Sequence, residues 1–168
     1  QVEYDFTPEL TAIGGLRYTT DRKEINALFD DSQFTGRSAT PFNASLYPNL
    51  ARKTFDNTSV RAELDWRPAS GLLLYSSYNR GHKGGNWAMP VFGMNPDPVL
   101  RAKEDFPTLP HDQEVLTSYE IGEKATFWNG RGKLNSSIYY YKYHNYQVFS
   151  LRNAVQELFN RDARVSGG

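Results

Sequence analysis

Apolar and polar residues alternate most regularly over residues 58–66. The even positions of this stretch are apolar, namely Val60, Ala62, Leu64 and Trp66. The odd positions are polar, namely Ser59, Arg61, Glu63 and Asp65. Because successive side chains of a strand point to opposite faces, this pattern predicts a β-strand with one apolar face and one largely charged face. Such a strand separates two solvents, of which only one is water.

A similar but less regular alternation predicts four further strands, over residues 10–20, 71–81, 117–128 and 132–150. In the first of them the even positions from Leu10 to Tyr18 carry no polar residue other than the tyrosine, and Ile13 is the exception on the polar side. In the second, both faces carry a mixture of residue types, so its facing stays open. The sequence therefore predicts an all-β protein.

The connections between these strands alternate in length. Short turn-forming sequences occupy residues 7–9, 67–70 and 129–131. Long stretches rich in Pro, Asn, Asp and Gly occupy residues 24–57 and 85–115. Structureless connections of that length are uncommon in compact domains, whereas short periplasmic turns alternating with long extracellular loops are typical of outer-membrane barrels. This alternation favours an antiparallel transmembrane β-barrel segment over a soluble fold.

Aromatic residues gather near both ends of the predicted strands. Trp66, Phe127 and Trp128 lie beside the short turns, and Tyr18, Tyr78, Tyr119 and Tyr140 lie towards the long connections. The path from Tyr119 to Phe127 is about 26 Å along a strand, or roughly 19 Å along the membrane normal at the usual tilt. That length approaches the apolar band of about 25 Å between two aromatic girdles. The placement predicts that the strands cross a bilayer.

Composition removes several other classes of protein. Lys plus Arg and Asp plus Glu both number 19, so no excess of positive charge suggests a nucleic-acid partner. No apolar run approaches the roughly 20 residues of a transmembrane helix. The chain has no Cys, which removes disulfides and cysteine-based metal sites. The hydrophobic content of 39% suits a barrel, because a barrel strand needs only every second residue to be apolar.

The alternation assigns a facing to individual side chains. We expect six apolar residues to face lipid: Leu16, Val60, Leu64, Trp66, Ile121 and Phe127. We expect six charged residues to face the lumen: Arg17, Arg61, Glu63, Asp65, Glu120 and Lys124. An ion-paired, hydrated interior is our main interpretation of the second set, and direct ligand contact by Arg17 or Arg61 is the alternative. Glu123 falls on the apolar face, where it either pairs laterally or is turned away by a bulge.

Aromatic residues of the long connections are the other candidates for ligand contact. Trp87, Phe92 and Phe106 lie in one connection, and Tyr47 lies in the other with Phe34 and Phe42. Aromatic rings supply large contact areas for a small-molecule ligand such as a sugar, although packing within the loops is the favoured alternative. The carboxylate pairs at 30–31 and 104–105 are interpreted as solvated loop charges, so no catalytic residue and no enzymatic activity are predicted. The three His residues are far apart in sequence, and we expect no metal site and no cofactor.

Several segments resemble TonB-dependent outer-membrane receptors. Residues 10–21 (LTAIGGLRYTTD) resemble their Gly-Leu-Arg-Tyr strand, and residues 74–81 (LYSSYNRG) resemble their Tyr-Ala-Ser-Tyr-Ser-Arg-Gly strand. Residues 118–124 (SYEIGEK) are similar to their Tyr-Glu-Ile-Gly-x-Lys strand. The segments 139–143 (YYYKY) and 160–164 (NRDAR) follow in the family's order, so the resemblance covers nearly the whole chain. A departure is Glu123, where the family usually has an apolar residue.

The resemblance implies a plugged barrel of about 22 strands, of which residues 1–168 would form an open sheet of about five to seven strands. It also implies localisation in the outer membrane of a Gram-negative bacterium and uptake of a scarce nutrient, such as a ferric siderophore. The implied partners are membrane lipid, the small-molecule ligand, and the TonB complex acting through a plug that this sequence does not contain. We therefore expect a fragment of a receptor barrel. The alternatives are a passive porin, a barrel enzyme and a soluble carbohydrate-binding β-sandwich.

Overall fold

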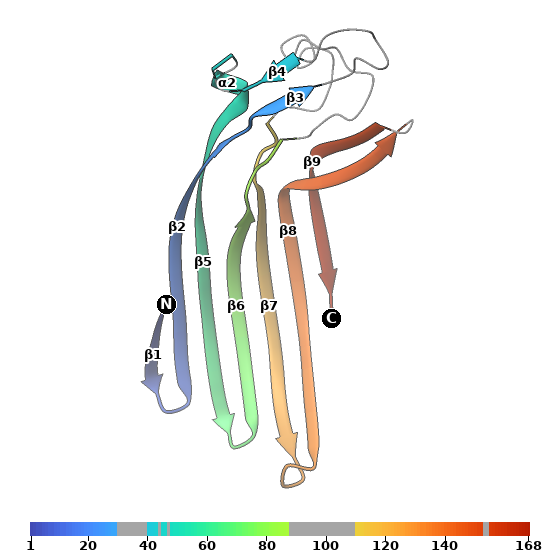
Figure 1. Cartoon of the computed structure of the whole chain (residues 1–168). Helices are drawn as coiled ribbons and strands as arrows, with labels where there is room; N and C mark the ends of the chain where they lie inside the picture. Colours follow the sequence, from blue (N-terminus) through green and yellow to red (C-terminus); the bar gives the residue numbers. More distant parts are fainter. Residues whose placement is uncertain (30–39, 44, 47, 88–109, 153–154) are drawn as a thin grey trace.

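Seven strands form one antiparallel sheet, in the order β1-β2-β5-β6-β7-β8-β9, in a computed structural model of the chain (Figure 1). The structure describes residues 1–29, 40–43, 45–46, 48–87, 110–152 and 155–168. The strands are β1 (Val2–Thr7), β2 (Leu10–Glu24), β5 (Arg52–Ala69), β6 (Leu72–Lys83), β7 (Glu114–Phe127), β8 (Gly132–Arg152) and β9 (Val155–Gly167). This confirms the predicted antiparallel sheet and its number of strands.

Regular structure also occurs in the first long connection. Strands β3 (Ala27–Phe29) and β4 (Thr40–Phe42) pair in a separate two-stranded sheet, and α2 (Pro48–Ala51) leads directly into β5. The sequence had placed the start of that strand at residue 58, but β5 begins at Arg52 because residues 52–57 pair with the far end of β2. None of the helical residues that the structure describes forms a segment long and apolar enough to cross a bilayer.

Three tight turns join neighbouring strands at the same end of the sheet (Figure 1). Between β5 and β6 the turn is confined to residues 70–71, because β5 extends to Ala69 after a register shift that follows Trp66. The sequence had assigned residues 67–70 to this turn. Gly71 has φ of +80°, and a Cβ atom there would lie 2.6 Å from the carbonyl oxygen of Thr126. Both the left-handed backbone conformation and the close carbonyl oxygen therefore favour glycine at this position.

The register between strands brings residues of the same type together. The β2–β5 ladder runs without a shift from the pair Leu10↔Trp66 to the pair Glu24↔Arg52. The register also settles the facing of β6, because Tyr78 lies opposite Ala62 and therefore on the apolar side. All even positions of β6 from residue 72 to residue 80 follow it.

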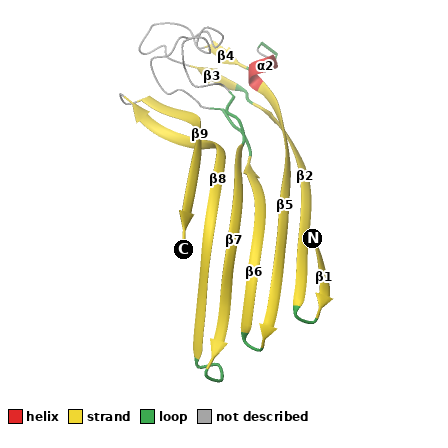
Figure 2. Ribbon diagram, turned by 180° about the vertical axis from the view of Figure 1, so that it is seen from behind, coloured by secondary structure: helices red, strands yellow, loops and turns green. Residues whose placement is uncertain are grey.

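The third connection at the long-loop end is a bent hairpin. Strands β8 and β9 continue beyond the end of β7 and turn away from the sheet together (Figures 1 and 2). The β8–β9 register shifts between Tyr143 and Tyr146, and Asn145 has φ of 55°. A bulge of this kind bends a strand locally. Strand β9 starts at Val155 and pairs with β8 along the bent hairpin.

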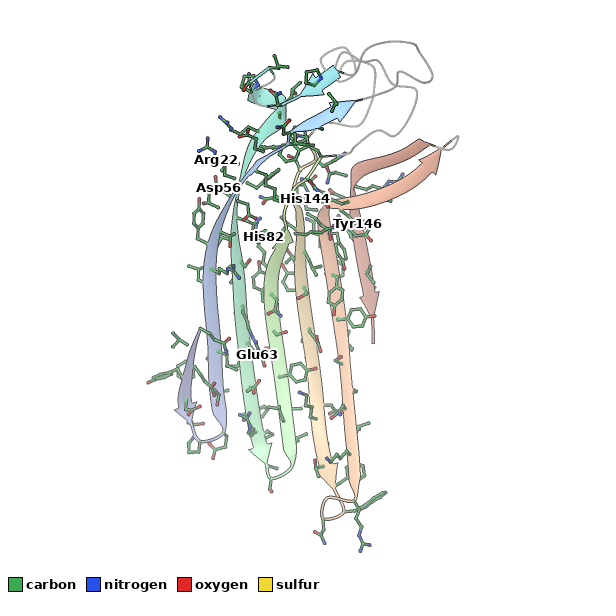
Figure 3. All side chains as sticks on the ribbon, in the orientation of Figure 1. Arg22, Asp56, Glu63, His82, His144 and Tyr146 are labelled. Atoms are coloured by element: carbon green, nitrogen blue, oxygen red, sulfur yellow. The ribbon has the colours of Figure 1, made fainter. Side chains whose placement is uncertain are left out.

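The sheet is a single layer, and its side chains project from both faces (Figure 3). The buried apolar residues among those described are Ala51, Phe55 and Trp87, all of which lie near the long connections. Large apolar side chains along the strands are open instead, and Leu16 and Ile121 are 75% and 69% exposed. A soluble monomer rarely exposes a patch of this kind. The apolar face therefore requires a covering that the chain itself does not supply.

Candidate functional site

The register collects the charged residues that were expected to face the lumen on one face of the sheet. Asp65 lies opposite Tyr75, and Glu63 lies opposite Ser77, which in turn lies opposite Glu120. Lys124 lies opposite Leu73, so it shares this face. The six apolar residues that were expected to face lipid lie together on the opposite face of the sheet. The strand registers place five of them there, and alternation along β7 adds Phe127. Strand alternation predicted both groupings.

Hydrogen bonds and ion pairs link most of the charged groups on the polar face. Tyr75 donates its hydroxyl hydrogen to Oε1 of Glu120 over 2.6 Å, and Nζ of Lys124 lies 5.4 Å from the centre of the Tyr75 ring. Arg61 pairs with Glu63 at 2.7 Å, and Arg67 donates to the buried Asp65 at 3.0 Å. These contacts fit an ion-paired interior, in which the carboxylates keep a positive or donating neighbour.

Arg17 differs from this network. It lies on the polar face opposite Ser59 and is exposed. Within the part of the chain that the structure describes, no hydrogen bond or ion pair holds its guanidinium group. Of the two arginines considered for ligand contact, Arg17 thus keeps its hydrogen-bond donors available, whereas Arg61 is occupied by Glu63.

Glu123 keeps its place on the apolar face. The ladders on both sides of β7 contain no register shift, and Glu123 lies between Leu74 and Ser136. The hydroxyl of Ser136 donates to Oε1 of Glu123 over 3.1 Å. Lateral pairing, and not a bulge, is therefore how this carboxylate is accommodated. A carboxylate on a lipid-facing surface is still costly, by an amount that depends on its depth.

The bases of the two long connections meet in a compact group that we call the loop-base cluster. Its members are Lys23, Lys53, Phe55, Gly85, Trp87 and His111. Two ammonium groups approach the Phe55 ring: Nζ of Lys53 lies 5.3 Å from the ring centre and Nζ of Lys23 lies 6.0 Å from it. Lys53 also pairs with Asp112 at 2.6 Å, and Lys23 donates to the Gly85 carbonyl over 2.8 Å. Alternation along β5 places Phe55 on the same face as Arg61.

Trp87 holds two segments of the loop-base cluster together. Its side chain is 7% exposed, and its indole nitrogen donates to the Leu50 carbonyl over 2.7 Å. Gln147 of β8 reaches the same region and donates to the carbonyls of Gly84 and Asp112 over 3.2 Å each. This position fits the loop-packing interpretation of Trp87. The other aromatic candidates, Phe92, Phe106 and Tyr47, lie outside the described residues.

His111 is fully buried in the loop-base cluster. Its backbone N–H donates to the Asn86 carbonyl over 2.7 Å, and neither ring nitrogen makes a hydrogen bond of normal geometry with the described residues. Burial lowers the pKa of this imidazole below its ordinary value, although the nearby Asn160 amide and Asp112 carboxylate act in the opposite direction. The neutral ring is therefore the form that the closed cluster favours.

The three His residues do not come together. His82 shares a hydrogen bond of 3.2 Å with Ser59, His111 is buried, and His144 pairs with Asp162 at 3.0 Å beside the bend of β8 (Figure 3). Among the described residues, no group of three His, Asp or Glu side chains has an arrangement suited to a metal ion.

Sequence reasoning missed most of the loop-base cluster. Lys23 and Lys53 are direct partners in the β2–β5 ladder, so extending the register from Leu10↔Trp66 would have paired them. That step required β5 to start earlier than its alternation suggests. No local signal could have found His111, because its neighbours come from three separate segments.

Comparison with known proteins gives one result for the whole chain. The family model for TonB dependent receptor-like β-barrels matches residues 1–168. No curated protein and no solved structure matches the chain.

Proposed function

Because the chain belongs to the family of TonB-dependent receptor-like β-barrels, we propose that it forms part of the wall of a receptor that imports a scarce nutrient, such as a ferric siderophore. Members of this family are transporters of the Gram-negative outer membrane, and the family is not an enzyme family. The chain's own share of this function is lipid-facing wall, lumen lining and the bases of two substrate-facing connections.

The division of the sheet into two faces is the observation that carries this proposal. One face has charged residues joined by ion pairs, and the other has open apolar residues between aromatic groups at both ends. Water on one side and lipid on the other would satisfy both faces at once. We place the tight turns in the periplasm and the long connections outside the cell, following the usual layout of such barrels.

Ligand contact is proposed for the polar face near the long connections. Arg17 is the better candidate of the two arginines, because its donors are available to an anionic ligand or to a plug. Trp87 would act by fixing the loop-base cluster, and Phe92, Phe106 and Tyr47 stay as proposed contacts of the connections. The TonB complex would act through a plug region and would not touch these strands.

The facing is tested with single cysteines, which the chain allows because it has none of its own. Ile121→Cys and Ser118→Cys place a probe on the apolar face and on the polar face of the same strand. In the full-length receptor in vesicles, with any other cysteines replaced, a fluorophore at 121 should be quenched from within the lipid. A fluorophore at 118 should be quenched by aqueous iodide. Equal quenching at both sites would contradict the barrel wall.

Energised import is tested by uptake in cells. Cells that produce the full-length receptor should accumulate at least one labelled ferric siderophore from a panel, and should lose this uptake when TonB is removed. Uptake that persists without TonB would indicate a passive porin. A receptor that inserts correctly but takes up no ferric siderophore would contradict the proposed substrate class.

A further inference from the structure

The apolar face carries a row of tyrosines towards the long connections. Tyr78 lies opposite Tyr119, which lies opposite Tyr140, so the three rings follow one line across β6, β7 and β8. Their ring centres are 5.2 Å and 6.3 Å apart. In a membrane protein, amphipathic rings in this position lie at the level of the lipid headgroups.

A row of cations follows the tyrosines on the same face. Two residues further along each strand, Arg80 lies opposite Thr117, Thr117 lies opposite Lys142, and Lys142 lies opposite Arg164. Two residues correspond to roughly 7 Å along a strand. The corresponding position in β5 is Val60, which lies opposite Arg80. None of the five positions in this row, from β5 to β9, is a carboxylate. Its positive charge therefore lies just beyond the aromatic row, on the side of the long connections.

Lys142 and Arg164 are an unfavourable pair unless an anion lies between them. Like charges directly opposite each other destabilise a sheet, and both side chains are exposed. The other directly opposed pair of lysines, Lys23 and Lys53, shows the contrast, because Asp112 neutralises Lys53 at 2.6 Å. Among the described residues, no carboxylate forms an ion pair with Lys142 or Arg164.

The surrounding charges do not cancel this row. The nearest carboxylate on the face, Asp162, pairs with His144 at 3.0 Å and accepts the backbone N–H of Asn145 at 3.1 Å. Lys142 is close enough to interact with it electrostatically. Arg80 is held against β5, where it donates to the Thr58 carbonyl and, over 3.3 Å, to Oδ1 of Asn57. Lys142 thus has one carboxylate near it, and that carboxylate already has two other partners.

We propose that Lys142 and Arg164 bind the phosphate groups of lipid headgroups at the outer surface of the membrane. This site rests on the proposed function, which places the apolar face in lipid and the long connections outside. A guanidinium group can bind phosphate through two parallel hydrogen bonds, and a lysine adds a mobile charge beside it. The phosphate would relieve the repulsion between the two side chains, while Tyr140 contacts the less polar part of the same lipid.

The test is a titration of the full-length receptor, purified in a neutral detergent, with a phosphorylated glycolipid. The same glycolipid without phosphate and inorganic phosphate alone are the two comparison ligands. We expect the phosphorylated lipid to bind most tightly. The double variant Lys142→Gln, Arg164→Gln should bind it roughly tenfold or more weakly, and the affinity of the unaltered receptor should fall as salt is raised. Binding of the dephosphorylated lipid should be the same for both proteins.

Lys133→Gln is the matched control, because Lys133 is an exposed lysine of the same strand near the tight turn. It should leave binding unchanged. The proposal is overturned if the double variant binds the phosphorylated lipid like the unaltered receptor, or if removing the phosphates has no effect. It is also overturned if inorganic phosphate binds as tightly as the lipid. The probe at Ile121→Cys separates the two proposals: lipid quenching there with no loss in the double variant defeats only the headgroup site.

Discussion

At the scale of single residues, space is tightly restricted at Gly85. A Cβ atom at this position would lie 2.2 Å from the Phe55 ring and 2.5 Å from the His111 carbonyl oxygen. We predict that Gly85→Ala destabilises the loop-base cluster by roughly 1–3 kcal/mol, because overpacking forces its neighbours to move. Faster amide hydrogen exchange at residues 84–87 and 111–113 would report the change.

Gly81→Ala is the control for this substitution. Gly81 lies in β6, shortly before Gly85 in the chain, and a Cβ atom there would meet no atom within 4 Å. The exchange rates of the Gly81→Ala variant should stay close to those of the unaltered protein. If both alanine variants behave alike, packing against Phe55 is not what requires glycine at position 85.

His111 gives the loop-base cluster a pH dependence. Burial lowers the pKa of the ring in the closed state below 6.5, the ordinary value that it regains when the cluster opens. As pH falls below 6.5, the open state therefore binds more protons than the closed state, and the closed state loses stability relative to it. This loss ends once pH is below the lower pKa of the closed state. We predict that protection of residues 111–113, corrected for the intrinsic exchange rate, is full above pH 6.5 and falls at pH 5.5. His111→Gln should remove this dependence, and an equal pH effect in that variant would assign it to another group.

At the scale of secondary structure, the sequence predicted strands where alternation is regular and lost them where it is not. The strand around Val60 was predicted because apolar and polar residues alternate over residues 59–66 without exception. Residues 52–57 were missed because Lys53 and Phe55 share the polar face, where the loop-base cluster buries the phenylalanine and pairs the lysine. The bend of β8 and β9 depends on contacts between segments that are distant in sequence, so no periodic pattern of residues predicts it.

The contacts that hold this bend centre on Asn160. Its side-chain amide donates to the Asn145 carbonyl over 2.6 Å and to the Asp112 carbonyl over 3.2 Å, and its Oδ1 accepts the Asp112 N–H over 3.2 Å. We predict that Asn160→Ala loosens the hairpin from the loop-base cluster by about 1–2 kcal/mol. Faster hydrogen exchange at residues 112 and 145–147 would show it.

Asn135→Ala is the matched control for the bend. Asn135 is an exposed residue of β8 near the tight turn, and its side chain makes no hydrogen bond with the described residues. Its replacement should leave exchange at the bend unaltered. Unchanged exchange in Asn160→Ala as well would mean that the backbone bulge holds the bend without this side chain.

At the scale of the whole molecule, the sheet has one face without a covering and two edge strands, β1 and β9. Unpaired edges and exposed apolar surface both promote association. We predict that residues 1–168 produced alone are insoluble without detergent, as measured by sedimentation and size-exclusion chromatography. A monodisperse, folded monomer in plain buffer would favour the soluble β-sandwich alternative.

The unbroken β2–β5 ladder also limits which genetic changes the protein can tolerate. Its pairs continue from Leu10↔Trp66 to Glu24↔Arg52 without a shift. Loss of a single codon inside either strand would reverse the facing of every later residue in that strand, and would bring charged side chains onto the apolar face. We therefore expect gains and losses of codons in natural variants to fall in the long connections, while single-base substitutions are spread more evenly along the gene.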